Sequence, residues 1–204
     1  LDFWEPCFAI ELEWALLEGL RQCLDRKAGR STFLRLSTRP IEQRLIEPAL
    51  ARLGRDGLRA AVLNGGYSIR PARGEGPLVH IVTTGVLVAD ALAAAEALAV
   101  EGVDTNVIHL VSPRRAYTTW REGSRTERHL FDSLIPEGQR SAPIITVCDA
   151  ASHSLAWIGS VFGQRAHPLG VDVYGQSGNR ESVYRYVGIH RDNIIAEALA
   201  AVDA

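Results

Sequence analysis

Two turns in this chain carry residue types that could hold a ligand or move a proton. Thr83-Thr84-Gly85 follows an apolar run, where a strand would meet a helix whose free backbone N–H groups can hold an anion. We favour a simpler interpretation of that turn, in which Thr84 caps the helix start. Asp149 and His153 follow another apolar run and could do acid–base chemistry or cap the next helix.

The polar loop Gly175–Glu181 is a third candidate, because surface loops often bind ligands. Here too we favour a structural role, a turn that ends in a helix cap supplied by Ser177 or Asn179. His80 and His109 lie in apparent strands and could be buried neighbours across a sheet. No third ligand stands at helical spacing from them, so core histidines are favoured over a metal site.

Larger motifs do not change this picture. The chain has no glycine-rich dinucleotide fingerprint, no phosphate loop and no G-x-S-x-G turn that would expose a nucleophilic serine. The residue types alone therefore indicate an α/β domain without a self-sufficient active site.

Composition narrows the class of protein. The chain has 204 residues, 47% hydrophobic and 23% charged, which is ordinary for a globular protein with one substantial core. A net charge of −2 gives no reason to expect nucleic acid or an anionic membrane as partner. Three widely spaced cysteines predict neither a disulfide framework nor a zinc site, so a reducing, cytoplasmic setting fits best. The complete lack of methionine suggests a fragment of something longer.

The stretch Leu78–Val111 predicts the unit around which the fold is built. A short β-branched run is followed by a helix with apolar residues three or four apart, at positions 88, 92, 95 and 99. Gly102 marks the end of that helix, and Asp104–Val111 is a second apolar run. Strand, helix and strand in this order predict a three-layer α/β fold with an open, mostly parallel sheet. Strands at Pro143–Cys148 and Pro168–Val173 extend it, and helices are expected near 114–120, 155–162, 180–186 and 191–201.

The chain before this unit cannot bury its own apolar surface. Pro6–Asp25 predicts a helix and Ser31–Ser37 a strand. The apolar helix face holds Phe8, Leu12, Ala15 or Leu16, and Gly19 or Leu20, and Trp14 widens it. We expect either an appendage on the later core or the tail of a domain that lies mostly elsewhere. The charged residues 43–66 predict a linker with one short helix near Pro48–Leu53, and Tyr67–Arg70 a possible edge strand.

Three stretches carry motifs in a distinctive order. Glu5-Pro-Cys-Phe-Ala-Ile-Glu11 opens the first helix, Val82-Thr-Thr-Gly85 leads into the alanine-rich helix, and Gly170-Val-Asp-Val-Tyr-Gly-Gln-Ser177 precedes the last two helices. Together they resemble the C-terminal part of thiamine-diphosphate enzymes of the transketolase superfamily. The resemblance implies that residues 1–42 end a pyrimidine-binding domain, 43–66 form a linker, and 67–204 form a transketolase-type C-terminal domain.

One branch of that superfamily, the homodimeric pyruvate dehydrogenase (decarboxylating component), resembles the chain most. Transketolases have Pro-Ala-Asp where this chain has Pro6-Cys7-Phe8, and an aromatic ring cannot replace the aspartate that hydrogen-bonds a sugar hydroxyl. The pyruvate enzymes have an aromatic residue there and close on a motif similar to Ser177–Ser182. They also carry a histidine-bearing loop where this chain has Ser37–Gln43, which leaves the substrate open.

The resemblance implies a parent oxidoreductase that decarboxylates a 2-oxo acid, pyruvate, on thiamine diphosphate. Its alternatives are a transketolase, which transfers ketol units between sugar phosphates, and a non-catalytic regulatory or scaffold module of the same fold. Phe8, Glu11 and Arg39 would frame the substrate channel. Arg39 could pair with a substrate carboxylate or phosphate, or lie on the linker surface.

The resemblance also implies cofactors and partners. The family's Gly-Asp-Gly motif for the diphosphate and magnesium, and its cofactor-activating glutamate, have no match here and would lie upstream of Leu1. We therefore expect the fragment alone to be inactive, with no catalytic, cofactor-binding or metal-binding residue of its own. The parent would be a homodimer, and a dihydrolipoyl acyltransferase core is a further possible partner.

Overall fold

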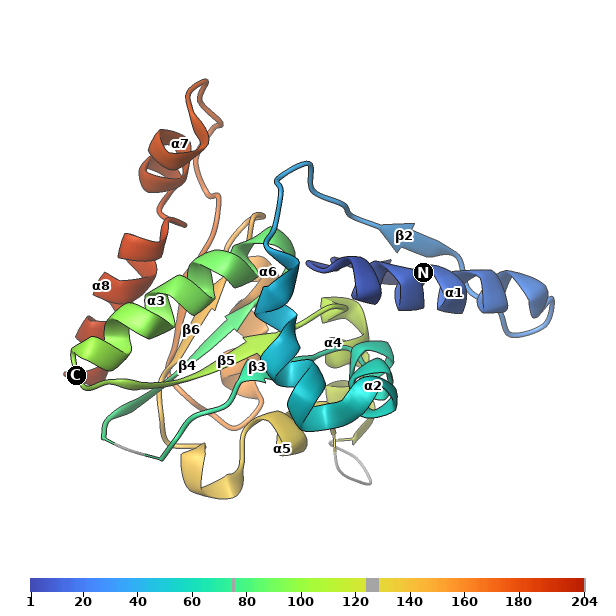
Figure 1. Ribbon diagram of the computed structural model, residues 1–204, viewed down its shortest axis with the longest axis horizontal. Helices are drawn as coiled ribbons and strands as arrows, with labels where there is room; N and C mark the ends of the chain where they lie inside the picture. The colour runs from blue at the N-terminus through green and yellow to red at the C-terminus, as the bar shows by residue number, and fades with distance from the viewer. Residues whose placement is uncertain (75, 124–128, 204) are drawn as a thin grey trace.

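The computed structural model describes residues 1–74, 76–123 and 129–203. Within them, an open five-stranded sheet has the order β3, β5, β4, β6, β7 (Figure 1). The strands β4 (Leu78–Thr83), β5 (Asp104–His109), β6 (Ile144–Val147) and β7 (Ala166–Leu169) are parallel, and β3 (Tyr67–Arg70) runs antiparallel to β5 at the edge. The predicted mostly parallel sheet and its edge strand are confirmed.

The register of β4 and β5 decides which side chains share a face. These strands pair from Leu78 opposite Asp104 to Thr83 opposite His109, and every residue of β5 is buried. Neighbouring residues of a strand point to opposite faces, so His80 lies on one face with its partner Asn106, and His109 on the other. Both histidines are buried, but they are not neighbours.

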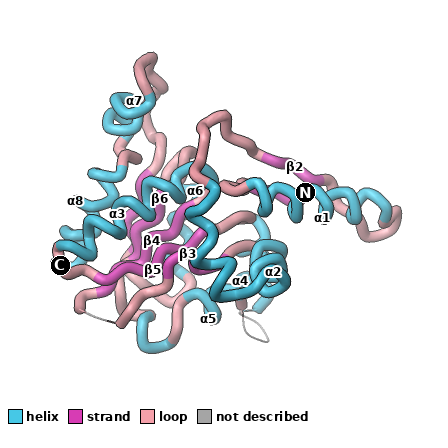
Figure 2. Tube along the Cα trace, in the orientation of Figure 1, coloured by secondary structure: helices cyan, strands magenta, loops and turns pink. Residues whose placement is uncertain are grey.

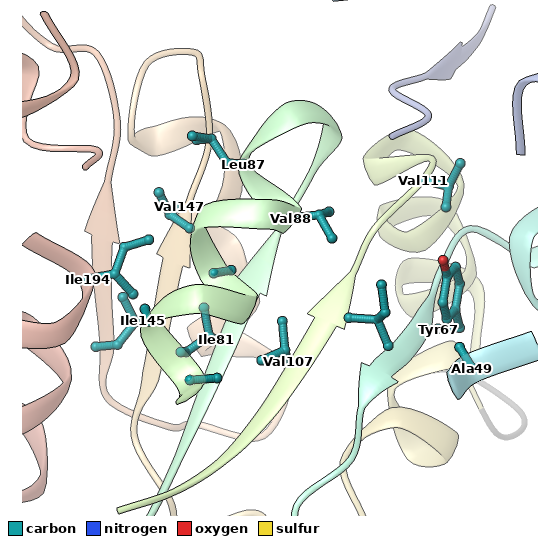
Figure 3. Close-up of a cluster of buried hydrophobic side chains, with 14 of the residues drawn as sticks. Ala49, Tyr67, Ile81, Leu87, Val88, Val107, Val111, Ile145, Val147 and Ile194 are labelled. Atoms are coloured by element: carbon teal, nitrogen blue, oxygen red, sulfur yellow. The ribbon is translucent and has the colours of Figure 1, made fainter. Parts of the chain in front are cut away.

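Helices cover both faces of the sheet, which confirms the three-layer architecture (Figure 2). On one face α3 (Val88–Val100) packs against α8 (Arg191–Val202), over a core that includes Ile81, Val107, Ile145 and Ile194 (Figure 3). The other face packs against α4 (Pro113–Gly123), α5 (Leu130–Leu134), α6 (His153–Ala156) and the 3-10 turn η4 (Trp157–Ser160). The remaining helix of this part, α7 (Arg180–Val187), stands away from the sheet.

Several predicted elements differ in extent from the observed ones. The strand expected at Ser31–Ser37, for example, covers only Thr32–Leu34. The last strand ends at Leu169 rather than Val173, because its partner β6 ends at Val147, directly opposite. The expected short helix in the linker is α2 (Glu47–Asn64), preceded by a 3-10 turn η1 (Gln43–Ile46). Gly54, with φ of 70°, breaks α2 without ending it, since Leu58 and Val62 continue the helix as fully buried residues.

Residues 2–36, called here the N-terminal lobe, extend from one side of the C-terminal body, residues 67–203 (Figure 1). The lobe contains β1 (Asp2–Trp4), α1 (Ala9–Leu24) and β2 (Thr32–Leu34), and its two strands pair in parallel. The predicted apolar face of α1 is wrong in part, because Leu16 and Leu20 are about half exposed. The face that docks onto the rest of the chain carries Trp14, Ala15 and Gly19, which were also predicted, together with the charged Glu11.

No helix within the described ranges is both long enough and apolar enough to cross a lipid bilayer.

Candidate functional site

Glu11 lies fully buried in the first turn of α1, between the N-terminal lobe and the body. Its Oε2 accepts hydrogen bonds from the backbone N–H groups of Cys7 (2.8 Å) and Phe8 (3.0 Å). Its Oε1 accepts one from the Tyr67 hydroxyl on β3 (2.7 Å) and lies 3.1 Å from Nδ1 of His109 on β5. A single carboxylate therefore completes the start of α1 and ties it to two strands of the body.

The electrostatics of this cluster suit a structural role, in which Glu11 holds the lobe on the body, better than a role in proton transfer. Burial raises the pKa of Glu11, but His109 and the hydrogen bonds from Tyr67 and Phe8 outweigh it, so the pKa is lowered. Burial, and then the Glu11 carboxylate, raise the pKa of the Tyr67 hydroxyl and of the Cys7 thiol. At neutral pH the carboxylate is charged, while the hydroxyl and the thiol keep their protons. Cys7 is thus not an activated nucleophile.

Phe8 and Arg39 line one small cavity of about 150 Å³, beside Leu12 and Ile41. The Phe8 ring is buried and meets the His109 ring edge-on, with centroids 6.4 Å apart. Glu11 lies outside that cavity lining. The structure thus brings two of the three expected channel residues to one cavity. No contact tests whether all three frame a substrate channel, and that role stays a prediction.

The Arg39 guanidinium is held by protein groups. It forms an ion pair with Asp90 in the first turn of α3, and the two side chains are only 16% and 13% exposed. It also contacts the Tyr184 hydroxyl on α7. In this structure Arg39 therefore fixes the chain that follows β2 to two helices of the body.

A second polar cluster surrounds Glu5 at the carboxyl ends of β4 and β6. The Thr84 hydroxyl donates to Glu5 Oε2 at 2.8 Å, and an Arg35 nitrogen donates to Oε1 at 3.1 Å. Arg35 also donates to the backbone carbonyl of Asp149. Thr84 does begin the helical segment, but its hydroxyl is used by Glu5 and makes no cap hydrogen bond. The favoured side-chain cap at this turn is therefore wrong.

The Glu5 cluster occupies a position where open α/β sheets often bind ligands. The chain goes from β4 to β5 on one side of β4 and then to β6 on its other side. Such a switch point in strand order leaves a crevice at the carboxyl ends of the parallel strands. A polar cavity of about 260 Å³ here is lined by Glu5, Arg35, Ser37 and Asp149. Burial, with a further contribution from Glu5, raises the pKa of the Asp149 carboxyl, although Arg35 opposes this. The N-terminal lobe thus inserts a charged network into the crevice.

Arg115 on α4 forms a third link between lobe and body. Its guanidinium lies 2.6 Å from an oxygen of the buried Asp2 and 3.1 Å from Oε1 of Glu18. It also donates to the backbone carbonyl of Leu63 and stacks 4.5 Å from the centre of the Trp4 ring. The sequence offered no signal for this residue, because its partners lie about 50 to 110 positions away.

Of the other sequence candidates, Asn179 and Asp149 have structural roles. The Asn179 side chain accepts from the backbone N–H of Ser182 at 3.0 Å, so the expected cap at the start of α7 is confirmed. Asp149 pairs with Arg35, and His153 is exposed in α6. Among the residues that the structure describes, no group of three or more His, Cys, Asp or Glu side chains is placed to hold a metal ion.

Comparison with known proteins shows which family this chain is similar to. A model of the transketolase-like TK C-terminal domain matches residues 65–190. The chromosomal and plasmid transketolases of Cupriavidus necator are 28% and 30% identical to the chain, each over 96% of the chain and 25% of the relative. The chain therefore spans about a quarter of the length of these relatives.

Solved structures show the same fold. A transketolase mutant from Pichia stipitis superposes with a TM-score of 0.69 over 99% of this chain and 25% of its own, at 16% identity. A split-gene transketolase, described as an inactive beta4 tetramer, gives 0.62 over 99% of this chain and 58% of its own, at 15% identity. Since the matched model also covers most of the sequence, this chain belongs to the transketolase C-terminal domain family.

Proposed function

We propose that this chain is the C-terminal part of a thiamine-diphosphate-dependent transketolase, an enzyme that transfers ketol units between sugar phosphates. The observation that carries the proposal is the match of 96% of the chain to two relatives that are both transketolases. It favours this activity over the pyruvate dehydrogenase activity expected from the position of Phe8.

The role of the chain within such an enzyme is to hold the end of one domain against the next. Residues 1–42 would end the pyrimidine-binding domain, 43–66 connect the two domains, and 67–204 form the C-terminal domain. Support comes from three links between the lobe and the body, Glu11 with His109, Glu5 with Thr84 and Asp2 with Arg115, in each of which the lobe supplies a buried carboxylate. The exposed leucines of α1 support a further contact of the lobe beyond the described residues.

Thiamine diphosphate and a divalent metal are implied by the family for the full enzyme, and the described residues do not fit them. A diphosphate needs cations or free N–H groups, whereas the cavity at the switch point is lined by the carboxylates of Glu5 and Asp149. Its one guanidinium, Arg35, already contacts both of these residues. We therefore assign the cofactor to residues outside this chain and derive no step through it.

Phe8, Glu11 and Arg39 form the proposed contribution of the chain to the substrate channel. Phe8 and Arg39 supply its wall, and Glu11 holds Phe8 in place through the backbone N–H. Because Asp90 fixes the guanidinium, Arg39 would act with limited freedom to move. Glu11 is a positioning residue in this scheme, since its carboxylate is fully buried.

The activity test uses the full-length parent protein. Sugar phosphates and, separately, pyruvate with an artificial electron acceptor are supplied as substrates. We expect turnover on sugar phosphates, and a fall of about tenfold or more in kcat/KM for Arg39→Ala, which removes a wall residue. Arg44→Ala, at an exposed position outside the cavity, is the matched control and should leave activity unchanged. Turnover on pyruvate alone would overturn the proposal.

A pyruvate dehydrogenase-like activity is the second candidate, and one contact favours it. The buried Phe8 ring packs against His109 and offers no hydrogen bond where transketolases place an aspartate. A homodimer is proposed in either case, while an acyltransferase core as partner belongs only to this second candidate. A non-catalytic module of the same fold would fail to bind thiamine diphosphate at full length, which calorimetry measures directly.

A further inference from the structure

A second cavity of about 370 Å³ shares Glu5 and Thr84 with the polar crevice and is lined by residues from β1, α4 and α6. Three aromatic side chains line it: Phe3 of the lobe, Tyr117 of α4 and Trp157 of η4. The Tyr117 and Trp157 rings meet edge-to-face with centroids 5.1 Å apart. The Trp157 indole N–H already donates to the Ser154 carbonyl at 3.1 Å, so this side chain offers the cavity an apolar ring.

The lining of the cavity also includes polar residues. Glu5, Thr84 and Cys148 line it, at the carboxyl ends of β4 and β6. A carboxylate can accept about four hydrogen bonds, and Glu5 accepts one from Thr84 and one from Arg35. Burial raises the pKa of Cys148 to about 11, so its thiol adds no charge. Glu5 therefore has acceptor capacity for a ligand N–H.

The position of the cavity is also typical of a ligand site. It lies at the switch point of the sheet and between two parts of the chain, both of which are preferred places for small-molecule binding. Its volume falls in the range of about 300 to 1,000 Å³ that such sites have. The cavity lining includes one cationic side chain, that of the exposed Arg114.

We propose that this cavity binds a nucleobase-type ligand, a planar nitrogen heteroaromatic ring that carries an amino group. The ring packs against Phe3, Tyr117 and Trp157, and the amino group donates to a Glu5 oxygen. In a nucleotide, the phosphate reaches Arg114, which pairs well with phosphate oxygens. The proposal does not depend on the catalytic activity proposed above, because no residue of the channel lines this cavity.

Adenosine and AMP are the probes, and each is titrated into the full 204-residue chain by calorimetry and ligand-observed NMR. We expect both to bind, AMP more tightly. Tyr117→Ala should weaken both by about tenfold, since one base–aromatic stack is worth about that factor. Arg114→Ala should remove the advantage of AMP and leave adenosine unchanged.

A blocking variant separates this cavity from the rest of the surface. Ser154 is exposed on the lining, so Ser154→Trp should abolish binding of both probes without unfolding the chain. Ser160→Trp is the matched control, because Ser160 is exposed nearby but does not line the cavity. Circular dichroism verifies the fold of each variant. If Tyr117→Ala unfolds, Ser154→Trp alone shows whether the probes bind in this cavity. Failure of the wild-type chain to bind either probe, or unchanged binding by Ser154→Trp, would overturn the proposal.

Discussion

In the C-terminal body, a five-stranded sheet lies between two helical layers, and residues such as Ile81, Val107 and Ile145 are completely buried (Figure 3). The N-terminal lobe has two three-residue strands and one helix, on which Leu20 and Leu24 are 55% and 84% exposed. A pair of short strands is at best marginally stable alone. The body is therefore stabilised by apolar burial, whereas the lobe depends on what it docks onto.

The contacts that dock the lobe are both apolar and polar. Trp4, Phe8 and Trp14 are buried in the same apolar core as residues of the body, and the charged groups at this interface are paired. Glu11 contacts β3 and β5, Glu5 contacts Thr84, and Arg115 contacts Asp2. A buried charge is tolerated only with well-placed partners, so each link permits few orientations. The difference between the two regions teaches that the body has an apolar core of its own. The lobe only adds apolar side chains to that core, and paired charges fix how it is oriented there.

The largest effect is expected from Glu11→Ala. The change leaves the Tyr67 hydroxyl and two backbone N–H groups buried without their acceptor, so the free energy of unfolding should fall by about 3 to 5 kcal/mol. Urea denaturation of the chain measures this. Glu13→Ala, on the same helix but half exposed, is the control and should cost far less. Equal losses in the two variants would show that the lobe does not depend on the buried carboxylate.

The contribution of apolar burial to stability can be tested in the core of the body. Ile81→Ala opens a cavity beneath α3 and should lower the free energy of unfolding by about 2 to 5 kcal/mol. Leu24→Ala removes an equally apolar but exposed side chain of the lobe and should change it by less than about 0.5 kcal/mol. Both values come from the same denaturation curves. A large loss at Leu24 would mean that the lobe has an apolar core of its own.

A smaller effect should depend on pH through Glu18. The hydrogen bond from Arg21, with others from Gln22 and Arg115, lowers the Glu18 pKa from 4.5 to about 2. A carboxyl whose pKa is lowered by folding stabilises the folded state above about pH 4.5 and loses this contribution as the pH falls towards 2. The Tm of the wild type should therefore exceed that of Glu18→Gln at pH 6 and approach it at pH 2. A constant Tm difference between these pH values would contradict the assignment.

The smallest effect on stability is expected at the exposed face of α1. Leu20→Glu should leave the free energy of unfolding within about 0.5 kcal/mol of the wild-type value, because this side chain is 55% exposed. It should still reduce concentration-dependent self-association of the chain, since it breaks an apolar surface. Sedimentation velocity measures this, with Arg26→Glu as an exposed control. Unchanged association would argue against a docking role for this face.

Local pattern predicted the elements of the body well. The spacing of apolar residues in Leu78–Val111 predicted β4, α3 and β5, and Gly102, with φ of 78°, ends the helix as expected. The Asn179 cap was also predictable, because it acts on a backbone group only three residues away. The apolar face of α1 was predicted less well, since the burial of Leu16 and Leu20 depends on neighbours that the helix does not specify.

The sequence by itself determined the fold class, the order of the elements and the family motifs, because these depend on residue types at short spacing. Only the tertiary structure decided where the charged residues act. Glu5 and Thr84 are 79 positions apart, and Glu11 and Tyr67 are 56 apart. No local pattern relates such pairs. They meet because the sheet brings the ends of its strands together and the lobe docks there, so that each buried charge finds its partner only in the folded chain.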